Sequence, residues 1–112
     1  MEIAIRPADA ADVPFLAWVQ QEAARSHLPQ GFWDIAFPGA EADRLRVVGR
    51  IAAAAPRSFC HWSGFLVAEA DGQPAAALSG YTAPSEAAGR LLMAAMGEAL
   101  DGCPGICRLL RP

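Results

Sequence analysis

The stretch FLVAEADGQPAAALSGY, residues 65–81, decides the fold. Two apolar runs meet at the dipeptide Asp71-Gly72, which tolerates positive φ and therefore favours a tight hairpin turn. The first run, 65–70, is apolar on both alternating faces, a pattern typical of a central strand whose two sheet faces are covered. We expect residues 65–70 and 74–81 to pair as antiparallel strands, with 74–81 at the edge of the sheet.

The sequence before the hairpin predicts one more strand and two helices. Residues 2–6 alternate in polarity and predict a short strand. Residues 12–25 and 40–55 have helical spacing of apolar side chains, and Asp12 is placed to cap the first of these helices. The segment between the helices, 27–39, contains two prolines and two glycines and is expected to be an aromatic-rich loop.

The sequence after the hairpin predicts a last helix over residues 85–101, which Ser85 can cap. Residues 103–112 show no period and are expected to form an irregular tail. Residues 1–102 then form one domain of the α/β class, more narrowly α+β, with element order β-α-α-β-β-α. We expect a three-stranded, mainly antiparallel sheet in which 2–6 pairs with 65–70, because the two-helix excursion can return the chain to that position.

Composition restricts the class of protein. With 112 residues, 54% hydrophobic and 19% charged, the chain is expected to be globular rather than disordered. The net charge of −3 argues against a nucleic-acid partner, because such proteins carry a basic surface for phosphates. The one tight basic group, Arg44, Arg46 and Arg50, is interpreted as a solvated helix face.

Three features of the sequence indicate where the protein is expected to be located. No basic segment followed by an apolar run opens the chain, so a secretory signal is not expected. No segment approaches the roughly 20 apolar residues that a membrane helix needs, so no membrane partner is expected. Three cysteines cannot all pair within one chain. A reducing cytoplasm is therefore the expected compartment.

Two segments together resemble a known family. IRPADAADVPFLAWV, residues 5–19, is similar to a family opening of strand, Arg-Pro and acidic-capped helix, and GFLVAEADGQPAAALSGY, residues 64–81, is similar to that family's second and third strands. The family is the GNAT superfamily of acyl-CoA N-acyltransferases. The resemblance covers roughly residues 3–82, the amino-terminal half of the GNAT fold. It implies an N-acetyltransferase in which an amine attacks the thioester of acetyl-CoA.

The signature that holds the cofactor in that family is not found in this chain. Complete members carry Gln/Arg-x-x-Gly-x-Gly/Ala at a helix start, where free N–H groups bind the pyrophosphate of acetyl-CoA. The nearest string, RVVGRI at residues 46–51, fails at its last position and lies inside a predicted helix. We therefore expect no cofactor-binding residues and no tight acetyl-CoA binding. Truncation and natural loss of the cofactor half both remain open.

Two functions follow from this pattern. The first is the substrate-side part of a GNAT-type N-acetyltransferase, inactive alone because the pyrophosphate-binding signature is absent. The alternative is a non-catalytic small-molecule-binding or dimerisation module on the same half-fold. In the family, the segment between the first two helices commonly lines the acceptor site. The resemblance thus implies a small-molecule amine as partner, with these substrate-binding residues: Phe32, Trp33, Asp34, Phe37 and Tyr81.

A packing interpretation of the same residues stands beside the binding one, and we favour it. In it, the aromatic side chains pack the loop onto the core, Asp34 caps the turn, and Tyr81 is a rim residue with its ring packed. Glu69 would act as a base only if burial raised its pKa, and it more simply points outward at the strand end. No catalytic residue is assigned.

Cys60 and His61 raise the question of a metal or a nucleophile. A zinc site needs about four ligands in characteristic pairs, and Cys103 and Cys107 do not supply such a pair. A catalytic thiol needs a base placed by the fold. We interpret the cysteines as structural and expect no metal site.

The predicted edge strand, 74–81, carries few charges that would prevent pairing with another chain. We therefore expect a homodimer through this edge. Alternatively, the last helix covers the exposed face of the sheet.

Overall fold

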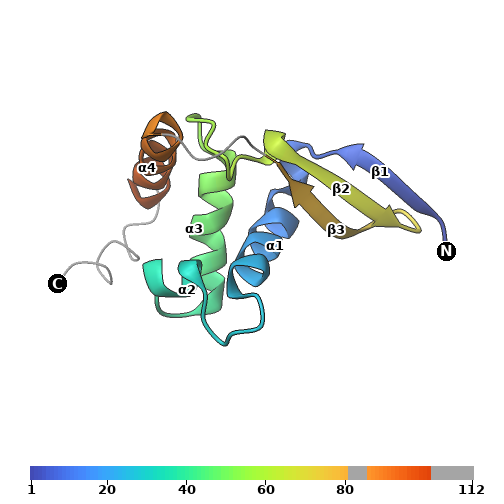
Figure 1. Cartoon of the computed structure of the whole chain (residues 1–112), viewed down its shortest axis with the longest axis horizontal. Helices are drawn as coiled ribbons and strands as arrows, with labels where there is room; N and C mark the ends of the chain where they lie inside the picture. The colour runs from blue at the N-terminus through green and yellow to red at the C-terminus, as the bar shows by residue number, and fades with distance from the viewer. Residues whose placement is uncertain (81–85, 102–112) are drawn as a thin grey trace.

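The structure, a computed structural model, describes residues 1–80 and 86–101 (Figure 1). Predictions for Tyr81, Ser85 and the tail 103–112 lie outside the described residues. The described part is an α+β fold with three strands, four α-helices and two 3₁₀ turns, η1 and η2. In chain order these are β1 Ile3–Pro7, η1 Ala10–Asp12, α1 Val13–Arg25, α2 Phe32–Ala36, α3 Glu41–Ala53, η2 Trp62–Gly64, β2 Phe65–Ala70, β3 Gln73–Ser79 and α4 Glu86–Asp101.

The sheet has the predicted order, β1-β2-β3, with both pairs antiparallel. The turn residues Asp71 and Gly72 have φ values of 50° and 82°, as the dipeptide predicts. The β2–β3 register shifts between Ala68, which faces Ala76, and Glu69, which faces Pro74. One residue of β3 is therefore unpaired in a bulge beside a proline, and the outer edge of β3 is irregular there.

Only one face of the sheet is covered by helices in the described part of the chain. Phe65 and Val67 of β2 pack with Leu16 of α1, and all three are buried. The next residue on the strand, Leu66, points to the opposite face and is 46% exposed. The prediction that both faces of β2 are covered is therefore wrong. Figure 1 shows the reason: α3 and α4 stack beyond α1, away from the sheet, instead of returning over it.

Two separate clusters of buried side chains form the core. The sheet core joins β2 to α1 and contains Ala8, Leu16, Phe65 and Val67. The helix core joins α1, α2, α3 and α4, and its buried members are Ala17, Trp33, Phe37, Val47, Val48, Ile51, Ala54, Cys60, Ala95 and Ala99. Helix α1 belongs to both cores, because neighbouring positions on a helix point in different directions.

The junction between β1 and α1 is fixed by an ion pair. The guanidinium of Arg6 donates two hydrogen bonds, of 2.8 and 2.9 Å, to the carboxylate of Asp12. This pairing lowers the pKa of Asp12 to about 2. The residue that caps the helical start is Asp9, whose side chain accepts a hydrogen bond from the N–H of Ala11. The prediction that Asp12 caps this helix is therefore wrong, since its side chain makes no capping hydrogen bond to α1.

Helix α2 occupies the segment that the sequence predicts to be a loop. It begins after Gly31, which is buried against the backbone of α1. A Cβ atom at Gly31 would lie 2.4 Å from the carbonyl oxygen of Ala24, closer than packed atoms approach. Glycine at this position therefore permits α2 to lie directly against α1.

The variant Gly31→Ala is expected to lower the free energy of unfolding by about 1–3 kcal/mol, because the added methyl group meets fixed backbone. Urea denaturation followed by circular dichroism measures the change. Gly64→Ala is the matched control, since no atom lies within 4 Å of the corresponding Cβ position. Its effect is expected to stay within about 0.5 kcal/mol. Equal losses in the two variants would contradict the close approach at Gly31.

Candidate functional site

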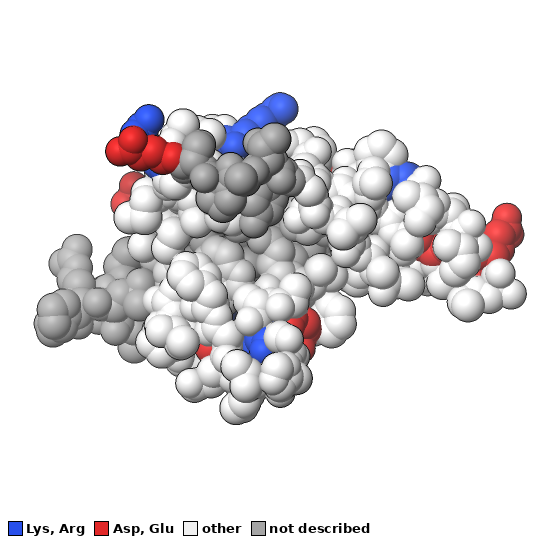
Figure 2. Space-filling view, in the orientation of Figure 1, with Lys and Arg blue, Asp and Glu red and all other residues white. Residues whose placement is uncertain are grey.

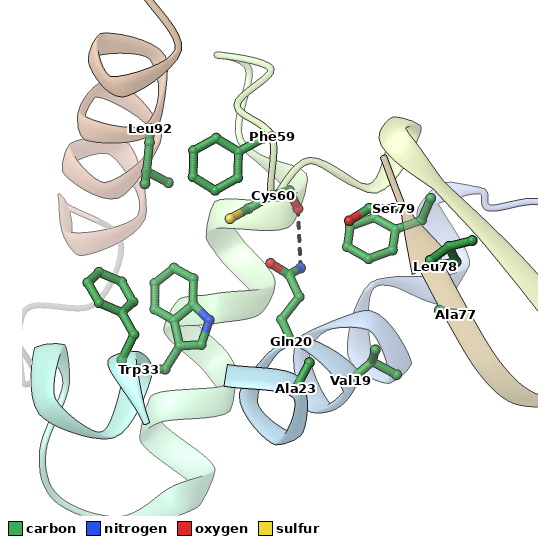
Figure 3. A pocket seen from close by; sticks show the side chains of 12 residues that line it. Val19, Gln20, Ala23, Trp33, Phe59, Cys60, Ala77, Leu78, Ser79 and Leu92 are labelled. Atoms are coloured by element: carbon green, nitrogen blue, oxygen red, sulfur yellow. Dashed lines mark hydrogen bonds between the residues drawn. The ribbon is translucent and has the colours of Figure 1, made fainter. Parts of the chain in front are cut away.

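A cavity of about 590 Å³ lies where the helix core and the sheet core meet. Its wall is formed by helices α1, α2 and α4, by strands β2 and β3, and by the segment before η2 (Figure 3). Its lining residues are Val19, Gln20, Ala23, Phe32, Trp33, Phe59, Cys60, Phe65, Ala77, Leu78, Ser79 and Leu92. The cavity exists because α1 separates the two cores, so that their side chains do not fill the space between them.

Among the described residues, few polar groups line this cavity and none of them is charged. The side-chain amide of Gln20 donates a hydrogen bond of 3.2 Å to the carbonyl oxygen of Cys60. This bond holds the amide nitrogen, and Figure 3 shows the amide oxygen of Gln20 on the side of Trp33. Ser79 contributes a hydroxyl group from the end of β3. The cavity therefore presents an apolar surface with a small number of neutral hydrogen-bonding groups.

Figure 2 shows that most of the described surface in this view is uncharged, with acidic and basic side chains in a few separate groups. The described residues that line the cavity include no Asp, Glu, Lys or Arg.

Cys60 lies in the cavity wall as an unreactive thiol. Burial raises its pKa to about 11, so the thiol is protonated and weakly nucleophilic at neutral pH. The neighbouring His61 makes its hydrogen bonds with Ser63. The Nδ1 atom of His61 accepts from the N–H of Ser63 and lies 2.8 Å from the hydroxyl of that serine, an arrangement that caps η2.

The environment of His61 favours the neutral form of its imidazole. Burial and the charge of Arg57 lower its pKa. Across the described residues, no group of three or more His, Cys, Asp or Glu side chains is placed to hold a metal ion.

Asp34 is buried outside the cavity, between two arginines. Its carboxylate accepts hydrogen bonds of 2.9 and 2.8 Å from Arg25 and lies 3.2 Å from a guanidinium nitrogen of Arg44. It also accepts from the N–H of Gly31 at 2.9 Å, so it caps the start of α2 as the packing interpretation predicts. The hydrogen bond from Arg25 is the main cause that lowers the pKa of Asp34.

Arg44 was expected on a solvated helix face, and this expectation is wrong. Its side chain is only 7% exposed, and its Nε atom donates to the amide oxygen of Gln21 at 2.8 Å. Gln21 is itself fully buried, although the helical pattern of α1 places it among polar residues. Arg46 does face solvent, where it pairs with Asp43 at 2.9 Å.

The other residues considered for a site lie in different places. Phe32 and Trp33 line the cavity, and Phe32 is 54% exposed beside its opening. Phe37 is buried in the helix core, where its ring stacks on Trp33 with centroids 5.9 Å apart. Tyr81 lies outside the described residues. Glu69 is not part of the cavity, and its carboxylate lies 3.4 Å from the guanidinium of Arg6.

Sequence reasoning missed two residues that shape the site, Gln20 and Ser79. Gln20 lies on the side of α1 that the helical pattern assigns to solvent, and Ser79 lies near the end of an edge strand. The sequence around neither residue indicates a function. The two residues are far apart in the chain, and only the fold brings them to the same cavity.

Comparisons with protein-family models, curated proteins and solved structures give no match to this chain. Among the helices in the described ranges, none combines the length and apolar character needed to cross a bilayer.

The variant Asp34→Asn is expected to lower the melting temperature by at least about 5 °C at pH 7, because it leaves the buried guanidinium of Arg44 without a carboxylate. Asp43→Asn is the matched control, since it breaks an exposed ion pair on the same helix as Arg44. A shift below about 2 °C is expected for it. Thermal unfolding followed by circular dichroism measures both.

The pH dependence gives a second measurement on these variants. The pKa of Asp34 is lower in the folded than in the unfolded state, so its stabilising contribution is fully present above the unfolded pKa of about 3.9 and is lost as pH falls. The difference in stability between wild type and Asp34→Asn should therefore shrink on acidification from pH 6 to pH 3. A difference that stays constant over this range would contradict the ion-pair assignment.

Proposed function

We propose that this chain is a non-catalytic small-molecule-binding domain built on a GNAT-like half-fold. The observation that carries the proposal is the uncharged, largely apolar cavity of about 590 Å³ between the two cores. Its volume falls in the range of about 300–1,000 Å³ that is typical of small-molecule sites. Such sites combine apolar walls with a few placed polar groups, as Gln20 and Ser79 provide here.

The lining selects the class of ligand. A charged group would lose its hydration in an apolar cavity without an opposite charge beside it. Asp34, the carboxylate that the family resemblance implies for an amine, is already occupied by Arg25 and Arg44. We therefore propose a neutral ligand with an aromatic or aliphatic body and one hydrogen-bonding group, such as an amide or hydroxyl, that Gln20 can reach.

The groups in the wall favour binding over chemistry. The thiol of Cys60 is protonated, because burial raises its pKa to about 11. The Nδ1 atom of His61 accepts a hydrogen bond from the N–H of Ser63 and lies 2.8 Å from the hydroxyl of that serine. General acid–base or nucleophilic catalysis needs a group with a pKa near the working pH and within reach of the substrate. We assign no such group in the wall of this cavity.

The second candidate function is the substrate-side part of a GNAT-type N-acetyltransferase. The sheet order supports it, since β1 pairs with β2 after a helical excursion and β3 follows by a tight turn. Phe32 and Trp33 also line the cavity from the segment that commonly lines the acceptor site in that family. In this case the acyl group would come from acetyl-CoA. Residues that are not among the 112 of this sequence would hold that cofactor, because the glycine signature is not found here.

The variant Ala23→Trp is expected to block the proposed site. Ala23 lines the cavity from the exposed side of α1, so an indole there would cover the opening without entering a core. The uncharged fluorescent probe N-phenyl-1-naphthylamine should bind the wild-type chain, and Ala23→Trp should weaken that binding at least about tenfold. Fluorescence titration measures the affinity, and the indole N–H resonance of Trp33 reports whether the probe enters the cavity.

Ala87→Trp is the matched control, because Ala87 is exposed on α4 and does not line the cavity. It should bind the probe as the wild type does. If both tryptophan variants bind the probe equally well, or if the Trp33 resonance does not respond, the probe binds elsewhere and the proposed site is wrong.

Acetyl-CoA gives a separate prediction for the two candidate functions. The isolated chain is expected to show no micromolar binding in isothermal titration calorimetry, because it lacks the glycine signature whose N–H groups would hold the pyrophosphate. Micromolar binding would contradict this expectation and would favour the acetyltransferase over the binding domain.

A further inference from the structure

The face of the sheet opposite α1, here called the open face, is formed without a charged side chain. The strand register places side chains from all three strands on it: Ile3, Ile5 and Pro7 of β1, Leu66, Ala68 and Ala70 of β2, and Gln73, Ala76 and Leu78 of β3. Gln73, beside the hairpin turn, is the only polar member. The large side chains are well exposed, with 66% for Ile5 and 70% for Leu78.

The open face is large for a protein of this size. Its four largest side chains, Ile3, Ile5, Leu66 and Leu78, are between 46% and 70% exposed, and a contiguous apolar patch of this kind commonly marks an interaction site. Stable domains cover the apolar face of a sheet with another layer. Helices α3 and α4 do not supply that layer, because they stack on the other side of α1 (Figure 1). The prediction that the last helix covers this face is therefore wrong.

The open face has a shallow hollow of about 180 Å³. Ala68 and Ala76 line it together with the larger side chains of Ile5, Leu66 and Leu78. The exposed apolar side chains of the open face thus lie next to an apolar hollow. In a two-fold symmetric pair, each protruding side chain of one copy can enter the depression of the other, since both copies present the same patch.

We propose that the open face binds a second copy of this chain, so that the two sheets pack face to face as a two-layered sandwich. Such sheets lie about 10 Å apart with interdigitated side chains. Face-to-face packing would remove the exposed apolar side chains of both copies from water at once, and stable interfaces bury about 1,200 Å² or more in total. The absence of charge on the face matters here, because identical copies would bring identical charges together.

The structure favours this face over the edge of β3 as the dimer contact. Edge pairing needs a regular row of free N–H and C=O groups. Pro74 and the adjacent bulge interrupt that row near the start of β3. Natural sheets use prolines and bulges in this way to prevent edge pairing. The open face shares Leu78 with the lining of the cavity between the cores, but Ile5 and Leu66 are not part of that lining, so variants at these two positions test the open face alone.

Analytical ultracentrifugation of the whole chain tests the proposal between about 5 and 500 µM, the range that resolves a dimer with a micromolar dissociation constant. The wild type is expected to form a dimer. Ile5→Lys, which places charge only on the open face, should weaken dimerisation at least about 30-fold. Ile35→Lys is the matched control, since Ile35 is 73% exposed on α2, and it should dimerise as the wild type does.

Leu66→Lys provides a second variant on the open face, and circular dichroism confirms that each variant is folded. A wild-type chain that is monomeric over the whole range overturns the proposal. A dimer that Ile5→Lys and Leu66→Lys leave unchanged also overturns it, because the contact must then lie on the edge of β3 or another surface.

Discussion

The carboxylate of Asp34 joins three helices of this protein. It contacts Arg25 of α1 and Arg44 of α3, and it caps the start of its own helix, α2. Helix α2 has only 5 residues and could not be stable alone, so these contacts hold it in place. Its position turns Trp33 into the helix core and provides one wall of the cavity. The candidate site therefore depends on an ion pair that is not part of it.

The division of the core explains why the chain has a cavity at all. Leu16 and Ala17 are neighbours on α1, yet Leu16 packs on the sheet and Ala17 packs in the helix core. A small domain has few large side chains with which to fill the space between two such clusters. The space that remains is apolar because its walls are the margins of both cores. Binding of a neutral molecule would complete the packing that the chain itself leaves unfinished.

The open face has a related origin. In a layered α+β domain, helices return across the sheet after each excursion. Here the chain places α3 and α4 on the far side of α1 instead, so the elements lie in a row of sheet, α1, α3 and α4 (Figure 1). The molecule is accordingly elongated, with extents of 49 × 30 × 26 Å. The proposed dimer would give this half-covered sheet its second layer.

The sequence alone determined the local elements. Asp71-Gly72 specified the hairpin, because positive φ at both positions is a property of the two residues themselves. Apolar spacing identified α1 and α3, and the two-helix excursion predicted that β1 pairs with β2. Only the tertiary structure decided which apolar faces are covered, why α2 is a helix, and why Gln21 and Arg44 are buried. Periodicity reports that a face is apolar but not what it contacts. Burial of a charge depends on a partner such as Asp34, which packing alone brings near.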